Sequence, residues 1–587
     1  MSCTTLLIGK AASIDGSTII ARDDDSGSGR YDPKRLVTVN PKDQPRHYRS
    51  VLSHVEIDLP DDPCRYTIAP NVLNNRGILA EAGASERNVA MSATETIAVN
   101  ERVLAADPMV ELRPAQGEPL NPDGTPNPYY TPETPGGIGE EDIITLVLPY
   151  VHTAREGVER LGELLERYGT YEANGVIISD VDEIWYVETI GGHHWIARRV
   201  PDDCYATIPN QLGIDDFDLK DAFGPQREYL CSADLREFMT EHRLDRTMPE
   251  HASAARGSGA GLAPARGVVG FAADGSIQSP DRFNPRMAFG TATAKDHIYN
   301  TPRAWYMQRC LNPSEDWDSP AARYTPTSDD IPWCRVPESK VTIEDVDRIL
   351  SSHYEGTPYD PYGTLGTPES RHRYRPIGVN RTGHMVAVQL RPYVPAPARA
   401  VMWVSFGSGP FTTVAPFYAN VRDTPSYLRD TTPQVSTGNL YWTNRLIAVI
   451  ADAHFYETSN AVEGYAEALR AYGHRHVALT DAAVVAGAAG ATATTGAADT
   501  AATTGATSVT DPANVTDTAR TANATAPADA ADAADAVAHD GAIALLEAAN
   551  ARMADELRTR TTRLLDDVLY TSSNLMHNAF AMSDRWA

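Results

Sequence analysis

The 587-residue sequence contains no apolar run approaching the roughly 20 residues that a membrane-spanning helix needs. Its beginning also lacks the basic stretch and the long apolar segment of a signal peptide. Basic residues are scarce: 51 Lys and Arg stand against 78 Asp and Glu, so the formal net charge is −27. Because such a surface repels phosphate groups and anionic lipids, we expect neither a nucleic acid nor a membrane as a partner. We expect a cytoplasmic protein.

Cysteine is also scarce, and its spacing excludes two kinds of site. There is no C-x-x-C pair, so neither a zinc knuckle nor a disulfide framework is indicated. The stretch GSGAGLAPARG lacks the strand and the GK[ST] ending of a phosphate-binding loop. We therefore expect no metal and no organic cofactor. The six cysteines are Cys3, Cys64, Cys204, Cys231, Cys310 and Cys334.

The apolar pattern indicates a mixture of strands and helices. Strand-like apolar segments occur at CTTLLIG, STIIARD, NGVIISD and EIWYVET. The segment DIITLVLPYVHTAREGVERLGELLERYGTY instead carries apolar residues at helical spacing, with Glu and Arg between them. The first 200 residues are therefore predicted to form strands joined by turns, with helical structure between them.

The clearest change in composition lies at residues 481–540. They are almost wholly Ala, Thr, Gly and Asp and contain no aromatic residue. Such a segment cannot bury enough apolar surface to offset the conformational entropy lost on ordering, so we expect a disordered insertion. Residues 541–587 then resume an amphipathic helical pattern, which we expect to pack on the main domain.

Cys3 stands at the start of an apolar run, and its neighbours depend on how the chain turns back. Asp15-Gly16 alone signals a two-residue hairpin, which would set Arg22 opposite Gly9 and roughly 20 Å from Cys3. A wider loop instead pairs Cys3 with Arg22. We favour the wider loop, because it gathers the thiol, the guanidinium and the carboxylates of RDDD at one end of the hairpin.

Such a cluster is suited to nucleophilic catalysis. A neighbouring guanidinium favours the thiolate, which is the nucleophilic form of cysteine. If Cys3 became the first residue of the chain, its own α-amino group could act as the base near neutral pH. Asp25 could then hold that ammonium or the amine of a substrate. The alternative is that Cys3 is a small apolar residue at the start of a buried strand.

The opening CTTLLIGKAASIDGSTIIARDDDSG closely resembles that of the cysteine dipeptidases of the N-terminal-nucleophile hydrolase superfamily. Further similar segments follow in the same order, among them SERNVAMSATETI, HIYNTPRAWYMQRCLNP and MWVSFGSGPFTTVAPFYANV. The resemblance implies an α+β fold, a four-layer αββα sandwich with the nucleophile on a central strand. Bile salt hydrolases and penicillin V acylase are more distantly similar. The Ala/Thr-rich insertion is where we expect this sequence to depart from the family.

The resemblance also implies a set of site residues, which the motifs ARDDD, IPNQ, YNTPR and SATET carry. The catalytic positions are Cys3, Arg22, Asp25, Asn210 and Arg303, and the substrate-binding position is Glu95.

Three of these positions have ordinary alternatives. The amide of Asn210 could donate to an oxyanion, or the residue could be a common turn asparagine. Arg303 follows Thr301 and Pro302, which resemble the N-cap and first residue of a helix, so it falls in a first turn that is usually solvated. Glu95 could hold the free ammonium of a dipeptide, or it could be a solvated residue at a strand end.

The sequence therefore predicts a cysteine dipeptidase that acts on small dipeptides through a thioester. A homo-oligomer is implied by the family resemblance alone. Residues 1–2 would be a short propeptide, residues 3–480 the hydrolase domain, residues 481–540 the insertion and residues 541–587 the C-terminal helical segment. Two alternatives remain. One is an amidase or acylase of the same fold that acts on N-acylated substrates, since fold does not fix the substrate. The other is a non-catalytic protein similar to the secernins.

Overall fold

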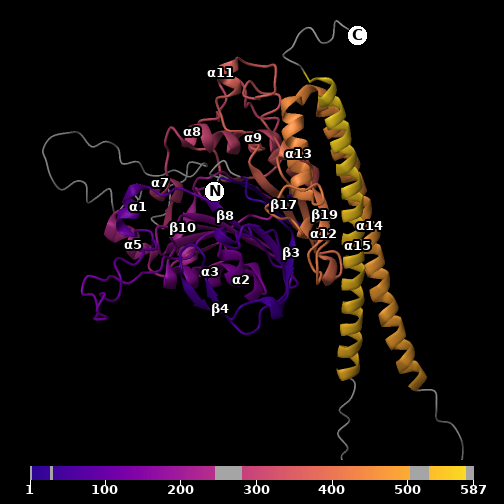
Figure 1. The fold of residues 1–587 in the computed structure, drawn as a ribbon, viewed down its shortest axis with the longest axis horizontal. Coiled ribbons are helices and arrows are strands. Elements are labelled where there is room, and N and C mark those ends of the chain that lie inside the picture. Colours follow the sequence, from indigo (N-terminus) through magenta and orange to yellow (C-terminus); the bar gives the residue numbers. More distant parts are fainter. Residues whose placement is uncertain (1–2, 27–30, 245–280, 503–527, 577–587) are drawn as a thin grey trace, which may run out of the picture.

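The chain forms two large antiparallel β-sheets with helices around them (Figure 1). The computed structural model describes residues 3–26, 31–244, 281–502 and 528–576; the side chains of residues 74, 93–95 and 488–538 lie outside this description. The mixture of helices and antiparallel sheets makes the protein α+β, which confirms the predicted class.

The first sheet has seven strands and carries the N-terminal strand near its centre. The strand order is β16-β12-β1-β2-β17-β18-β19, so β1 lies between β12 and β2. These strands come from the beginning, middle and later part of the chain. Their bounds are β1 Thr4–Ile8, β2 Thr18–Asp25, β12 Tyr205–Ile208, β16 Cys334–Arg335, β17 Thr382–Leu390, β18 Ala400–Phe406 and β19 Ala415–Tyr418.

The second sheet has eight strands, in the order β14-β11-β10-β9-β8-β7-β6-β3. Most of these strands are neighbours in sequence, as expected for hairpin connections. Their bounds are β3 Val37–Val39, β6 Tyr66–Ile68, β7 Ala82–Ser85, β8 Ala90–Thr96, β9 Asn174–Ser179, β10 Ile184–Ile190, β11 His194–Arg199 and β14 Tyr229–Cys231.

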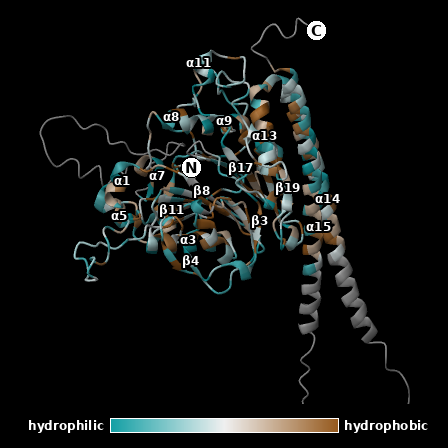
Figure 2. Cartoon of the chain, viewed as in Figure 1, coloured by the Kyte–Doolittle hydropathy of each residue, from teal (hydrophilic) through white to brown (hydrophobic). Residues whose placement is uncertain are grey.

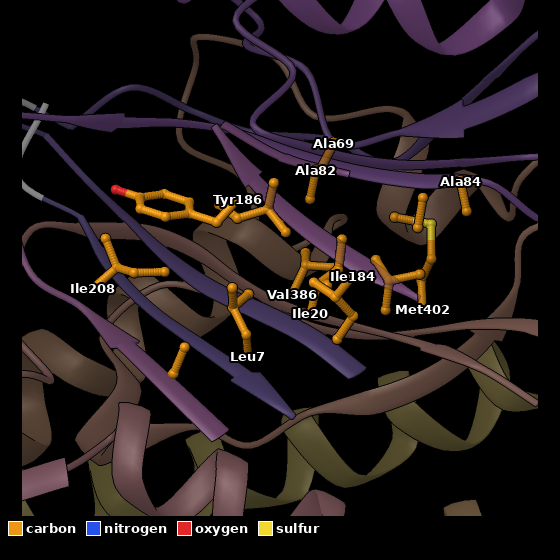
Figure 3. Packing of buried hydrophobic residues seen from close by; sticks show 14 of the residues in the cluster. Leu7, Ile20, Ala69, Ala82, Ala84, Ile184, Tyr186, Ile208, Val386 and Met402 are labelled. Atoms are coloured by element: carbon orange, nitrogen blue, oxygen red, sulfur yellow. The ribbon is translucent and has the colours of Figure 1, made fainter. Parts of the chain in front are cut away.

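A large apolar core lies between the two sheets. Leu7 and Ile20 of the seven-stranded sheet meet Ala84 and Ile184 of the eight-stranded sheet (Figure 3). In Figure 2, hydrophobic residues concentrate on the strands and on the helices beside them, such as α3 (Ala154–Tyr168) and α13 (Leu440–Ala453). The core therefore joins the two sheets into one body.

Helices cover the outward faces of both sheets. Leu6 and Ile8 alternate with Leu7, so they point to the other face of β1, where they pack with α9 (Thr301–Leu311) and α10 (Ile343–Leu350). The helices α2 (Ile143–Val147) and α3 cover the eight-stranded sheet in the same way. Because both of its faces are covered, β1 is buried throughout, which explains why three apolar residues, Leu6, Leu7 and Ile8, follow one another in it.

The helical segment predicted after residue 142 is confirmed as two helices rather than one. A 3-10 turn that contains Pro149 separates α2 from α3. The side chain of Thr153 caps α3 by accepting a hydrogen bond from the backbone N–H of Glu156. The helix ends at Gly169, whose φ of 68° suits a residue without a Cβ.

Two long helices, α14 (Phe455–Ala502) and α15 (Ala528–Asn574), run side by side along one side of the body and extend beyond it (Figure 1). They pack against α13 and the edge strand β19. The expected boundary at residue 481 falls inside α14. Val484 is 2% exposed, and Asp481 accepts hydrogen bonds from Arg391 and from the hydroxyl of Tyr418. Packed helix therefore continues beyond the point that composition predicted, while residues 503–527 of the expected insertion lie outside the described residues.

Shorter elements complete the described chain. Among its helices, none combines the length and the apolar character that crossing a bilayer requires. The remaining strands are β4 His47–Arg49, β5 Glu56–Asp58, β13 Phe217–Asp218 and β15 Arg282–Phe283. The remaining α-helices are α1 Glu101–Ala106, α4 Leu219–Ala222, α5 Leu235–His242, α7 Pro285–Phe289, α8 Asp296–Tyr299, α11 Pro368–Arg371 and α12 Ser426–Arg429.

Candidate active site

Cys3 lies immediately before β1, and the hairpin of β1 and β2 fixes what faces it. The observed register pairs Thr5 with Arg22 and Thr4 with Asp23. The predicted pairing of Cys3 with Arg22 is therefore wrong by two residues. Because a shift of two residues keeps each side chain on the same face, Arg22 remains on the side of Cys3. Its Nη2 donates a hydrogen bond to Cys3 Sγ over 2.7 Å.

The loop between the two strands explains the error in register. Its backbone finds partners outside the hairpin: the N–H groups of Ala11 and Ala12 both donate to the carbonyl of Asp202, and Ser13 forms a bridge with Val341. The predicted loop from Gly9 to Gly16 already contained these three residues, but the observed loop is two residues longer, since Ile8 pairs with Ile19. Contacts made far along the chain therefore decided the register.

A second acidic residue shares the guanidinium of Arg22. The same Nη2 lies 2.7 Å from Glu81 Oε2, and both Cys3 and Glu81 are fully buried. Sequence reasoning missed Glu81, because a single acidic residue in LAEAGAS gives no signal that its side chain faces the thiol. Cys3, Arg22 and Glu81 therefore form one buried cluster.

Asp24 and Lys34 form a buried ion pair close to this cluster. Lys34 Nζ lies 2.8 Å from Asp24 Oδ2. Burial raises the pKa of Asp24, but the charge and hydrogen bond of Lys34, together with His384 and Arg22, outweigh burial, and the pKa falls below its ordinary value. Burial likewise acts against the charged form of Lys34, yet Asp24 and Glu81 raise its pKa. Both groups therefore remain charged around neutral pH.

The expected absence of a metal can be tested against the donors at this site. Cys3 Sγ and carboxylate oxygens of Asp24 and Glu81 lie within 4.8 Å of one another, a spacing that a metal ion could use. Arg22 and Lys34 already lie within hydrogen-bonding distance of these two carboxylates. The donor set therefore fits protein cations better than an added ion, because a metal would first have to displace them.

Asp25 lies on the opposite face of β2 from Arg22, since successive side chains alternate. It accepts hydrogen bonds from Arg375 and, over 2.5 Å, from the hydroxyl of Thr382. Asp25 is thus engaged by an arginine that sequence reasoning did not identify. Thr4 Oγ1 accepts hydrogen bonds from both Arg375 and Arg303, so this face connects to the remaining site residues.

Arg303 and Asn210 meet at the main chain of Cys3. Arg303 is fully buried, although its place in the first turn of α9 is usually solvated. Its Nη1 donates to the carbonyl oxygen of Cys3, and its Nη2 donates to Asn210 Oδ1 over 2.8 Å. Asn210 Nδ2 donates to the carbonyl of Thr96 over 3.0 Å. The N-cap of α9 is Asn300 rather than Thr301, and its side chain also accepts from Arg303.

Glu95 occupies the end of β8, opposite Gly175 and just after an irregularity in the register. The next residue, Thr96, is the one whose carbonyl binds Asn210. The strand end that carries Glu95 is therefore adjacent to the predicted oxyanion residue. The side chain of Glu95 lies outside the described residues, so its contact with a substrate stays a prediction.

Five of the six predicted positions are thus connected through hydrogen bonds around Cys3 and Thr4. Residues 2–468 match the profile of peptidase family C69. The chain belongs to peptidase family C69. A dipeptidase of Bifidobacterium longum is 51% identical over 585 residues, which cover 100% of each chain. A probable dipeptidase A of Streptococcus pyogenes is 43% identical over 584 residues, again 100% of each chain. Dipeptidase A of Lactobacillus helveticus is 41% identical over 77% of this chain and 82% of its own.

The comparisons also concern the C-terminal part of this C69 peptidase. The family profile ends at residue 468, within α14. The alignments with the Bifidobacterium and Streptococcus relatives nevertheless run over the full length of each chain. Our expectation that the Ala/Thr-rich region sets this sequence apart from the family is therefore wrong for these two relatives.

Proposed function

We propose that this C69 peptidase is a dipeptidase whose nucleophile is the thiol of Cys3. The observation that carries the proposal is the hydrogen bond of 2.7 Å from Arg22 Nη2 to Cys3 Sγ. A guanidinium at this distance stabilises the thiolate, and burial of both groups strengthens the interaction. The names of the full-length relatives support dipeptides as the substrate class.

We also infer that the fold is the four-layer αββα sandwich of the N-terminal-nucleophile hydrolases. Three apolar cores support it: one between the sheets and one on each outward face, where helices pack. In this fold the active form begins at the nucleophile. Removal of residues 1–2 would free the α-amino group of Cys3, which could then act as the base.

The proposed reaction proceeds in two stages. The Cys3 thiolate attacks the carbonyl carbon of the dipeptide bond, and the proton held by the α-amino group passes to the departing amine as the C–N bond breaks. A water molecule then attacks the thioester, gives a proton back through the same amine, and releases the acid and the free thiol. Asn210 would donate its second amide hydrogen to the developing oxyanion, and Arg303 fixes the orientation of that amide.

Recognition of the free ammonium of a dipeptide is assigned to Glu95. Asp25 was the other candidate, but it is paired with Arg375 and Thr382. The strand end with Glu95 lies beside Thr96 and hence beside Asn210. A carboxylate there is expected to select substrates with a free amino terminus, because an acylated nitrogen carries no charge for it to bind.

The proposal is tested by assaying a panel of dipeptides beside the same peptides carrying an N-acetyl group. We expect hydrolysis of the free dipeptides and at least tenfold lower kcat/KM for the acetylated forms. Preference for the acetylated peptides would favour an amidase or acylase. Turnover of neither set would favour a non-catalytic protein.

A further inference from the structure

A single nitrogen atom of Arg22 contacts two acidic groups at the same distance. Its Nη2 lies 2.7 Å from Cys3 Sγ and 2.7 Å from Glu81 Oε2. Both acids and the guanidinium are at most 1% exposed, so no solvent screens their interaction. The positive charge of Arg22 therefore stabilises the ionised forms of both the Cys3 thiol and the Glu81 carboxyl group.

The backbone that carries Glu81 is held in an uncommon conformation. Glu81 has a φ of 61° and Leu79 a φ of 46°, both in the left-handed region, which is unfavourable for a residue with a Cβ. Lys34 Nζ donates to the carbonyl of Leu79 over 3.0 Å and thereby secures the segment. Backbone strain of this kind persists where the surroundings impose it and is concentrated at functional sites.

The strain has a specific result at this position. It directs the carboxyl group of Glu81 across the space between the sheets to Arg22 on β2. Its backbone carbonyl accepts a hydrogen bond from the hydroxyl of Ser92 on β8, which fixes the residue from the other side. The position of the guanidinium against the thiol therefore depends on Glu81.

We propose that Glu81 is a positioning residue for Cys3: its carboxyl group holds the Arg22 guanidinium against the thiol and, when ionised, competes with the thiolate for the same nitrogen. This inference rests on the proposed function in one respect, the role of Cys3 as nucleophile.

The charges around the cluster support a competition. Arg22 and Lys34 contribute two positive charges, and Asp24 contributes one negative charge, because its pKa is lowered by Lys34. His384 on β17 adds none around neutral pH, because burial lowers its pKa to about 3. These four side chains together carry one net positive charge, and Arg22 Nη2 presents it to Cys3 and Glu81 at the same distance.

Glu81 therefore titrates together with the thiol. Burial raises the pKa of Glu81 well above its ordinary value, and Asp24 and Glu140 add to the effect while Arg22 and Lys34 oppose it. Two acids that share one cation lose their protons in two steps, and the second loss is disfavoured by the first. With its carboxyl group protonated, Glu81 still accepts a hydrogen bond but leaves the charge of Arg22 to the thiolate.

The test measures ionisation of the thiol directly. Alkylation of Cys3 by iodoacetamide is followed across pH 5 to 10, and the modified N-terminal peptide is quantified by mass spectrometry. Glu81→Gln keeps the hydrogen-bond acceptor and removes the charge, so the alkylation midpoint should move down by about one pH unit. Asp347→Asn is the matched control, because Asp347 is also a buried carboxylate paired with an arginine, Arg470 of α14.

A second variant allows the same test if Glu81→Gln folds poorly. Glu81→Gly accepts a φ of 61° without strain and also removes the carboxylate, so its midpoint should fall in the same direction. Its kcat should fall at least tenfold below that of Glu81→Gln, because nothing then holds Arg22, whereas KM should change little. An unchanged alkylation midpoint in either folded variant would overturn the proposal. A shifted midpoint in a protein that hydrolyses no dipeptide would leave Glu81 in its role and overturn the proposed function instead.

Discussion

Arg303 and Asn210 form a hydrogen bond of 2.8 Å although 93 residues separate them in the sequence. The bond ties the oxygen of the Asn210 side chain to a fully buried guanidinium, so the amide nitrogen has one fixed direction. Arg303 also contacts the carbonyl of Cys3, which places this amide beside the proposed nucleophile.

Asn210→Ala should lower kcat by about 10²- to 10³-fold while leaving KM within a few-fold, because an oxyanion donor acts mainly in the transition state. Steady-state kinetics on a good dipeptide provide the measurement. Asn444→Ala is a suitable control, since Asn444 donates to the carbonyl of Phe406 away from these residues. An equal loss of kcat in both variants would contradict a specific role for Asn210.

Arg22→Lys should reduce turnover much more than folding stability. Lysine keeps the positive charge but loses the planar set of donors that reaches Cys3 Sγ. We expect kcat/KM to fall by at least tenfold, while the thermal unfolding midpoint changes by a few degrees. Unchanged kinetics would show that the contact of Arg22 with the thiol has no part in the reaction.

Cys3→Ala should abolish activity and also retain Ser2. Removal of Met1 alone would leave the nitrogen of Cys3 in an amide bond, and an amide cannot act as a base. The Cys3 thiol could attack the carbonyl of Ser2 and form a thioester that water cleaves. Intact-mass measurement of wild type and variant checks this. A fully active enzyme that still carries Ser2 would contradict the mechanism, whereas an inactive but trimmed variant would assign the cut to another peptidase.

Asp481→Ala should lower the free energy of unfolding by about 3 kcal/mol, because it leaves the buried Arg391 without its charged partner. Urea unfolding measures the change. Asp540→Ala is the control: Asp540 lies in the same expected insertion but is largely exposed in its pair with Arg422, so its effect should stay within about 0.5 kcal/mol. Equal effects would mean that the packing around Asp481 adds nothing to stability.

His384→Gln should make the protein less sensitive to acid. Burial lowers the pKa of folded His384 to about 3, with Arg22, Asp24 and Lys34 facing it, against an ordinary value of 6.5. Below pH 6.5 His384 is therefore protonated in the unfolded chain but stays neutral in the folded protein, so the free energy of unfolding falls as the pH drops towards 3. Between pH 7 and pH 5 this costs about 2 kcal/mol, which the variant should recover in urea unfolding. The exposed His372→Gln serves as control.

The local pattern of the sequence was sufficient for part of this site. CTTLLIG and STIIARD predicted two neighbouring strands. The prediction that Arg22 lies on the same face as Cys3 was correct although the register was wrong, because a shift of two residues keeps each side chain on its face. Asp25 was named from the RDDD motif and Arg303 through family resemblance, but the neighbouring sequence did not predict the burial or the hydrogen-bond partners of either residue. The sequence placed Arg303 in a first turn that is usually solvated, but the residue is fully buried, with its guanidinium hydrogen-bonded to the carbonyl of Cys3.

Other members of the site give no local signal at all. Glu81 contacts Arg22 because its backbone is left-handed, a conformation that the sequence LAEAGAS does not predict. Arg375 pairs with Asp25, although 350 residues separate them in the sequence. Composition misjudged α14 for a different reason. Alanine-rich sequence loses little entropy in a helix, so a few buried contacts, such as that of Val484, are sufficient to order it.

The seven-stranded sheet sets an order of events during synthesis. The ribosome makes the Cys3 strand first, but Arg303 and Arg375, which contact residues 3 and 4, follow 300 and 371 residues later. The strand β17, which pairs with β2 and so completes the sheet around Arg22, is translated later still. During most of translation the thiol therefore has none of these partners. Any reaction at Cys3, on a substrate or on its own leading residues, belongs to a chain that has been synthesised at least through β17.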